Sequence, residues 1–216
     1  MIDGGTVKNV ILKDVSISGD SDGDAGAICY KAQGTSTIYN CGILPTATTR
    51  DPDGNISGFT GSSVSGSRNV GSLVGLLDGQ ARVINCFSYA TVSGGSMMGG
   101  IVGNNAQTST MTDIKTIVVN CMFYGEITGA GSKFPVYGGN VIENSGATAI
   151  NNYNYYRESA LFDDGFILEN YNRSWPAEER NLTRFEYYRS ILNSNRRLCT
   201  WWVNGQQDIA PTDELV

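Results

Sequence analysis

Two short runs of alternating oxygen-bearing side chains have a spacing that could bind a cation. The run Asp-Ser-Asp-Gly-Asp carries Asp20, Asp22 and Asp24, and the run Asp-Pro-Asp-Gly-Asn carries Asp51, Asp53 and Asn55. Alternating oxygens beside a turn glycine suit Ca²⁺, which takes about 6–8 oxygen ligands. Neither run has the sixth-position glycine and twelfth-position glutamate of an EF-hand loop. Two interpretations stay open, calcium ligands or polar residues of exposed turns, and no other cofactor is expected.

The five cysteines are an odd number and follow no zinc-binding spacing. Cys41, Cys86 and Cys121 each follow an asparagine directly, at the same position of successive sequence repeats. This placement predicts stacked, buried thiols that act as small apolar side chains. A disulfide between neighbouring repeats is the alternative, because strands about 4.8 Å apart bring Cα atoms within disulfide range.

The sequence offers little for catalysis. It has no histidine, which excludes Ser-His-Asp and Cys-His sites and a His-Glu-x-x-His zinc site. Glycoside cleavage needs two carboxylates about 5–10 Å apart across the sugar. Acidic residues are sparse on the repeated segments, where Glu126 stands nearly alone. We therefore expect no enzymatic activity.

An internal repeat must position these side chains. Val-Gly-Ser-Leu-Val-Gly at residues 70–75 returns as Met-Gly-Gly-Ile-Val-Gly at 98–103, and Val-Ile-Asn-Cys at 83–86 returns as Val-Val-Asn-Cys at 118–121. Each copy closes on a short alternating run and a glycine, at residues 91–94 and 126–129. A repeat of this size indicates similar units stacked around one shared core.

Each unit contains three segments typical of short strands, at residues 72–77, 82–87 and 90–93 of the second unit. Three strands per turn predict an all-β, right-handed parallel β-helix of about four coils. We expect its asparagines to stack in a ladder. We also expect Gly71, Gly100 and Gly139 to take positive φ at coil corners. Insertions are predicted at residues 46–69, 104–115 and 130–135.

The two ends of the repeat region are less regular. A degenerate fourth unit carries Gly138-Gly139-Asn140-Val141 and Asn152-Tyr153. At the start, residues 7–11 match the second strand and residues 15–19 the third. No first strand is expected before them, so the chain would begin in mid-coil, with more coils preceding it in the natural protein. The solenoid domain is predicted to span residues 1–156.

The glycine element, the Asn-Cys element and the closing Val-x-Gly, recurring in that order, resemble the GLUG repeat over about residues 5–156. That repeat occurs in large secreted or surface-anchored bacterial proteins, including adhesins and the non-catalytic region of IgA-specific metallopeptidases. The resemblance implies a location outside the cell or at the bacterial cell surface. It also implies an adhesive or scaffolding role without catalytic residues.

Residues 157–216 differ in composition and are predicted to form a small α+β cap over the last coil. Glycine becomes rare, and Thr183 with Glu186 forms a capping box. Phe185, Tyr188, Ile191 and Leu192 then fall on one face of a helix predicted over residues 183–194. A strand is predicted over residues 199–203. Aromatic residues gathered here could instead form a glycan-stacking platform: Tyr153, Tyr155, Tyr156, Phe162, Phe166, Tyr171, Trp175, Tyr187, Tyr188, Trp201 and Trp202.

The net charge of the chain limits the classes of partner that it is expected to bind. The 216 residues carry 15 Lys and Arg against 21 Asp and Glu, a net charge of −6, which disfavours nucleic acid. No apolar run approaches the roughly 20 residues needed to span a bilayer, so no membrane insertion is expected. We predict a structural or adhesive module whose partner is a host or cell-surface protein or glycan. The alternative is a glycan-binding or glycan-cleaving parallel β-helix.

Overall fold

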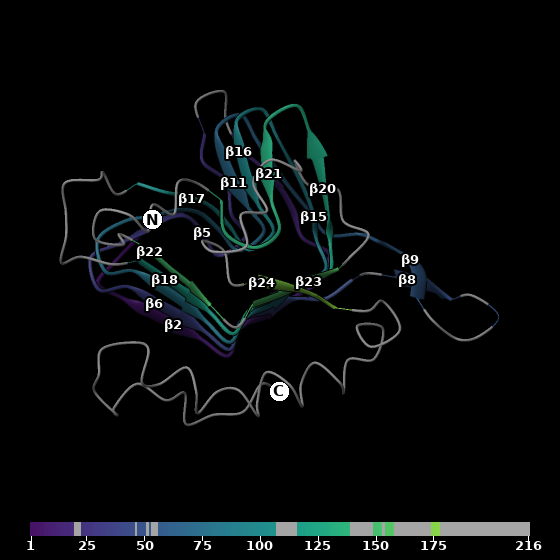
Figure 1. The fold of residues 1–216 in the computed structure, drawn as a ribbon, viewed down its shortest axis with the longest axis horizontal. Helices are drawn as coiled ribbons and strands as arrows, with labels where there is room; N and C mark the ends of the chain where they lie inside the picture. Colours follow the sequence, from purple (N-terminus) through teal and green to yellow (C-terminus); the bar gives the residue numbers. More distant parts are fainter. Residues whose placement is uncertain are drawn as a thin grey trace.

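The computed structural model describes residues 1–19, 23–45, 47–50, 52, 56–106, 116–138, 149–152, 154–157 and 174–177. Within these ranges the chain is all-β and contains no helix (Figure 1). Parallel strands stack in five sheets, an arrangement consistent with a parallel β-helix or solenoid. The helix predicted over residues 183–194 and the strand predicted over residues 199–203 lie outside the described residues, as does most of the predicted cap.

We name the five sheets A to E in the order in which one coil passes through them. Sheet A contains β1 (Ile2–Asp3), β5 (Cys29–Gln33), β12 (Val74–Leu77) and β17 (Val102–Asn105). Sheet B contains β2 (Thr6–Lys8), β6 (Thr37–Tyr39), β13 (Arg82–Ile84), β18 (Thr116–Val119) and β22 (Ala149–Asn152). Sheet C contains β3 (Ile11–Leu12), β7 (Gly42–Ile43), β14 (Phe87–Ser88), β19 (Met122–Phe123), β23 (Asn154–Arg157) and β24 (Ser174–Ala177).

Sheets D and E complete the coil. Sheet D contains β4 (Ser16–Ser18), β10 (Ser63–Gly66), β15 (Thr91–Gly94) and β20 (Glu126–Gly129), and sheet E contains β11 (Asn69–Gly71), β16 (Met97–Gly99) and β21 (Ser132–Phe134). In Figure 1 the strands of sheets B and C meet at an angle, and those of sheets D and E lie side by side. A complete coil such as β12 to β16 thus holds five short strands. The prediction of three is wrong, because the turn at Asn85 divides the predicted segment at residues 82–87 and an additional strand, β16, follows β15.

The predicted start of the stack is also wrong. Ile2 and Asp3 form β1, which pairs in parallel with β5 at Ala32 and Gln33. A first-sheet strand therefore precedes β2, and sequence comparison missed it because two residues carry too little pattern. The assignments of residues 7–11 and 15–19 to the following strands are confirmed in essence by the pairing of β2 with β6 and of β4 with β10.

Two predicted insertions contain regular solenoid strands. Val64 in β10 pairs with Val92, and Val70 in β11 pairs with Met98, so only the first part of residues 46–69 is inserted. That part contains the antiparallel hairpin of β8 (Ala47–Arg50) and β9 (Ile56–Thr60), which projects from the body in Figure 1. Likewise β21 occupies part of the predicted insertion at residues 130–135 and pairs with β16. Residues 107–115 of the remaining insertion lie outside the described ranges.

Glycines in the turn between sheets E and A are required for close packing rather than for positive φ, contrary to the prediction. A Cβ on Gly71 would overlap the Val74 carbonyl oxygen, and one on Gly100 would overlap the Pro135 carbonyl oxygen and the Phe123 ring. Neither glycine has positive φ, and Gly139 lies outside the described residues. Positive φ occurs instead at the turns between sheets A and B, at Gly34 and Gly79 with φ of 62° and 64°.

The core is built from similar apolar residues that occupy the same inward-facing position in successive coils. In sheet B the inward position is Val7, Ile38, Val83 and Val118 in successive strands, and Ile38, Val83 and Val118 are completely buried. Because parallel neighbours place like residues about 4.8 Å apart, each apolar side chain packs on its own counterpart. The coils therefore share one continuous core.

Candidate functional site

An asparagine ladder turns the chain between sheets B and C. Asn9, Asn40, Asn85 and Asn120 have φ of 57°, 52°, 55° and 54°, a left-handed conformation that asparagine tolerates better than most residues. The Nδ2 of Asn40, Asn85 and Asn120 each donates a hydrogen bond to the Oδ1 of the preceding asparagine, over 3.2, 2.5 and 2.7 Å respectively. The predicted ladder is confirmed, and its amide hydrogen bonds join successive coils.

A column of thiols lies one residue after the ladder. The Sγ of Cys41, Cys86 and Cys121 lies 3.8, 3.8 and 3.7 Å from the carbonyl oxygens of Val7, Ile38 and Val83 in the preceding coil. All three cysteines are completely buried, and no disulfide joins them. The prediction of buried, free, stacked thiols is therefore confirmed.

The last position in this column is occupied by Asn154, which alignment of the repeats did not identify. Val119 pairs with Asn152 and Met122 with Tyr155, so Asn154 stands beside Cys121, and the predicted match of Asn152-Tyr153 to Asn120-Cys121 is one residue out. The Nδ2 of Asn154 donates to the Val118 carbonyl oxygen over 2.9 Å, the contact that each cysteine makes one coil earlier. Aligning Tyr155-Tyr156 with Met122-Phe123 would have shown the correct register.

The chemistry of the thiols follows from their burial. Burial raises the pKa of Cys29, at the start of β5, to about 11 and raises that of Cys86 well above its ordinary value. The adjacent Cys86 thiol and burial together raise the pKa of Cys41. Because the thiolate is the nucleophile and the metal ligand, these protonated thiols are poor candidates for either role.

We predict that the four described cysteines react very slowly with iodoacetamide in the native protein. For Cys29, a pKa of about 11 lowers the thiolate fraction at pH 8 about 200-fold relative to an unfolded cysteine near 8.5. For all four, burial of the side chain also slows access of the reagent. The measurement is labelling followed by mass spectrometry in a Cys199→Ser background, because Cys199 lies outside the described residues. Labelling in guanidinium is the control, and native labelling of Cys41, Cys86 or Cys121 within minutes would contradict the prediction.

Of the predicted calcium ligands, only Asp24 lies among the described residues; Asp20, Asp22, Asp51, Asp53 and Asn55 lie outside them. The Asp24 Oδ1 accepts a hydrogen bond of 2.7 Å from the Asn69 Nδ2 and lies 3.9 Å from the Arg68 Nε. Asn69 in turn accepts a bond of 2.8 Å from Asn104. Asp24 therefore joins three coils through polar contacts, and within the described ranges no group of three acidic or cysteine side chains could hold a metal ion.

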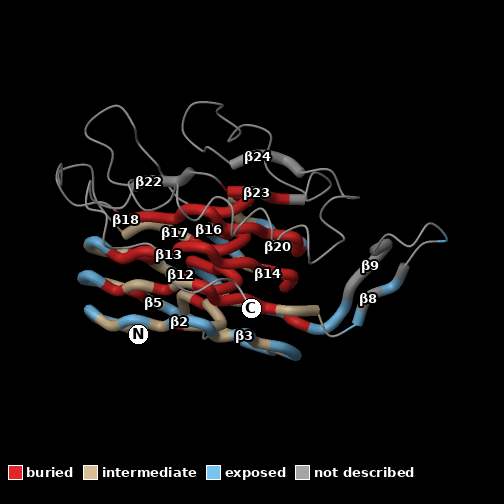
Figure 2. The backbone as a smooth tube through the Cα atoms, turned by 90° about the horizontal axis from the view of Figure 1, so that it is seen from below, coloured by how far each residue is buried: buried red, intermediate tan, exposed pale blue. Residues whose placement is uncertain are grey.

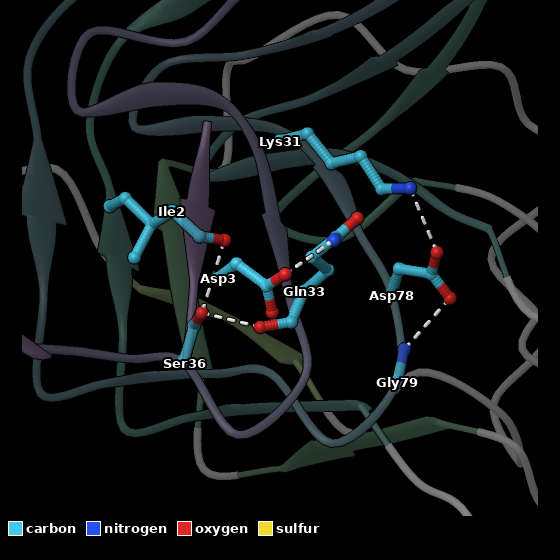
Figure 3. A network of polar contacts seen from close by, with 7 residues as sticks. All are labelled: Ile2, Asp3, Lys31, Gln33, Ser36, Asp78 and Gly79. Atoms are coloured by element: carbon cyan, nitrogen blue, oxygen red, sulfur yellow. Dashed lines mark hydrogen bonds and ion pairs between the residues drawn. The ribbon is translucent and has the colours of Figure 1, made fainter. Parts of the chain in front are cut away.

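A second polar cluster lies at the turn between sheets A and B (Figure 3). The Gln33 amide donates to Asp3 over 2.9 Å, and the Lys31 ammonium lies 2.9 Å from Asp78. The other Asp78 oxygen accepts the Gly79 N–H over 2.8 Å and so supports the positive φ of that glycine. Each carboxylate in the cluster has a neighbouring donor. We therefore interpret the cluster as a set of polar contacts that join neighbouring coils.

The described part of the predicted aromatic platform is not on the surface. Tyr156 is buried in the core cluster, and the side chains of the other members lie outside what the structure describes. Tyr89 and Tyr124, which the prediction did not include, are also buried, with ring centroids 5.3 Å apart. These rings support packing rather than sugar stacking.

No family model, curated protein or solved structure matches this chain. Within the described residues, no helix has the length and apolar character to cross a membrane.

Proposed function

We propose that this chain is a structural and adhesive module of a larger bacterial secreted or surface protein, without catalytic activity. In this proposal it is a right-handed solenoid of about four coils, similar to GLUG-repeat regions and closed by residues 157–216. Its partner is a host or cell-surface protein or glycan.

One observation carries the proposal: the asparagines, the thiols and three carboxylates of the described coils make contacts that join one coil to the next. Asparagine amides bind the preceding asparagine, thiols bind the preceding strand, and Asp24, Asp3 and Asp78 bind donors on neighbouring strands. A stack organised in this way maintains a long, stiff surface rather than a reactive centre.

The projecting hairpin is the part of the described chain best placed to contact a partner. β8 and β9 pair only with each other and stand away from the coils (Figure 2). An isolated two-stranded hairpin is only marginally stable in water. A contribution to the stability of the core therefore does not explain why the chain carries this hairpin. Loops carried on a rigid scaffold are frequent binding elements, and we assign adhesion to this one.

The test is retention of protein-coated beads on cultured epithelial cells. Beads carrying the full chain should be retained several-fold better than albumin-coated beads. A variant in which residues 47–60 are replaced by a short Gly-Ser linker should lose that excess while keeping its melting temperature, because β8 and β9 form a sheet separate from those of the coils. Equal retention of both bead types contradicts the proposal.

The same assay separates the glycan alternatives. Loss of retention after enzymatic removal of cell-surface glycans would identify a glycan partner, and loss after mild proteolysis would identify a protein. Incubation with purified mucin should release no reducing sugar. Release of reducing ends would favour the glycan-cleaving β-helix and overturn the assignment as a non-enzyme.

A further inference from the structure

The turn between sheets A and B carries the same two-residue element in three coils. Asp3 pairs with Gln33, and Leu77 pairs with Ala32, so Asp3-Gly4, Gln33-Gly34 and Asp78-Gly79 occupy equivalent corners. Their glycines have φ of 66°, 62° and 64°, and two of these corners are an aspartate followed by a glycine. This dipeptide is prone to a reaction of its own, because glycine has no side chain to keep its backbone nitrogen away from the preceding carboxyl group.

The reaction is the isomerisation of aspartate. The backbone nitrogen of the glycine loses its proton and attacks Cγ of the aspartate, a C–N bond forms, and one carboxyl oxygen leaves as water. Water then opens the resulting five-membered succinimide at the former main-chain carbonyl carbon. The chain now runs through Cβ and Cγ, and the former main-chain carbon becomes the carboxylate of an isoaspartate. One water is released and one is taken up, so the reaction requires no oxidant, cofactor or enzyme.

At Asp78 the two reacting groups already lie side by side (Figure 3). Its Oδ1 accepts the Gly79 N–H over 2.8 Å, so the nitrogen is in contact with the carboxyl group that it must attack. The Lys31 ammonium lies 2.9 Å from Oδ2 and fixes the orientation of the carboxylate. The Asp78 side chain is 36% exposed, which gives water access to the succinimide.

At Asp3 the same two groups have other partners. The Gly4 N–H donates to the Gln33 carbonyl oxygen over 3.3 Å, and the Asp3 Oδ2 accepts the Gln33 side-chain amide over 2.9 Å. The nitrogen and the carboxylate are therefore each bound to the next coil. Attack at this corner requires the loss of a hydrogen bond that joins two coils.

We propose that Asp78-Gly79 is a site of spontaneous isoaspartate formation in the folded protein, whereas Asp3-Gly4 is protected. The two sites share the dipeptide, the corner of the coil and nearly the same glycine φ. They differ in the acceptor of the glycine N–H, which is the aspartate's own carboxylate at Asp78 and a neighbouring carbonyl oxygen at Asp3. The partner of one N–H thus separates a reactive site from a protected one.

The product should weaken the join between two coils. Isoaspartate adds one carbon to the main chain at a turn with little room, since a Cβ on Gly79 would lie only 3.0 Å from the Gly34 nitrogen. It also moves the carboxylate away from its place beside Lys31. The Asp78 N–H, which donates to the Ala32 carbonyl oxygen over 2.9 Å, belongs to the same corner. We therefore expect the modified chain to melt at a lower temperature than the unmodified chain.

Ageing of the full chain in oxygen-18 water tests the proposal. After several weeks at neutral pH, peptide mapping should show an isoaspartate at position 78 that elutes apart from the aspartate peptide and carries one heavy oxygen, the signature of a succinimide. Its yield should exceed the yield at position 3 by at least about fivefold. Similar yields at the two positions, a higher yield at position 3 or no product at position 78 would each overturn the proposal.

Two controls separate the folded geometry from the dipeptide itself. In guanidinium, positions 3 and 78 should react at similar rates, because each aspartate follows an apolar residue and precedes a glycine. Asp78→Glu keeps the charge beside Lys31 but cannot close a five-membered ring, so it should lose the product at position 78. An excess at position 78 that persists in guanidinium would overturn the role of the fold.

The effect on the corner is measured on the same aged sample. The fraction that carries isoaspartate at position 78 is separated by ion-exchange chromatography, and its melting temperature is compared with that of the unmodified fraction. A lower value supports the weakening of the corner, and equal values would contradict it.

Discussion

Replacing Gly99 with alanine should destabilise the protein by at least about 3 kcal/mol, the upper range for added volume in a packed core. A Cβ at this position would overlap the Val102 carbonyl oxygen and would lie 2.7 Å from the Gly138 backbone nitrogen. Both are backbone atoms of the coil, so no side-chain rotation relieves the overlap. The turn between sheets E and A would have to open, and it is repeated in every complete coil.

The measurement is urea unfolding of the unaltered chain and two variants. Gly5→Ala is the control, because its new Cβ would meet only one side-chain methyl, the Ile2 Cγ2 at 3.2 Å, and no backbone atom, so its effect should stay within about 0.5 kcal/mol. If Gly99→Ala has no larger effect than Gly5→Ala, the close approach of the two backbone segments is not present in solution.

The second large effect is a loss of stability above pH 9 that depends on the buried thiols. Cys29, Cys41 and Cys86 have raised pKa values in the folded protein, whereas unfolded cysteines ionise near pH 8.5. Above that pH the unfolded chain releases protons that the folded chain keeps, so the free energy of unfolding falls as pH rises. Each such thiol contributes about 1.4 kcal/mol per pH unit.

The combined Cys29→Ala, Cys41→Ala and Cys86→Ala variant isolates this contribution. Between pH 9 and 10, under reducing conditions, the unaltered chain should lose about 4 kcal/mol more than the triple variant. Tyrosines and lysines also titrate in this range, but they are common to both chains and cancel in the difference. Parallel pH profiles for the two proteins would show that the thiols ionise in the folded state.

The elements that recur with a strong local pattern are predictable from the residues alone. The parallel stacking, the asparagine ladder and the buried thiols follow from residues that repeat in a fixed order, such as Asn85-Cys86 and Asn120-Cys121. Like residues in like positions meet across parallel strands, so the repeat itself specifies which side chains touch. The hydrogen bonds of Asn85 and Asn120 confirm that reasoning.

Repeat copies in which the recurring residues have changed could not be aligned correctly from the sequence. Asn154 takes the place of a cysteine, β10 and β11 follow the hairpin insertion, and β1 has only two residues. In each case the register is imposed by the neighbouring coil, which sits some 28 to 45 residues away along the chain, as shown by the pairs of Val74 with Val102 and with Cys29. An alignment of residue types alone cannot detect a position whose residue has changed while its neighbours in the adjacent coils have stayed the same.

The order of the recurring residues is enough to predict that the chain stacks similar coils and that asparagines and cysteines line one corner, because those contacts join copies of the same residue. The reason for its glycines and the burial of some outward-facing residues depend instead on contacts made by folding. Gly71 and Gly99 are required by carbonyl oxygens and backbone nitrogens that come close through folding. Ile84 and Val119 are not members of the core cluster and are nevertheless buried, which the alternation of residues along their strands does not predict.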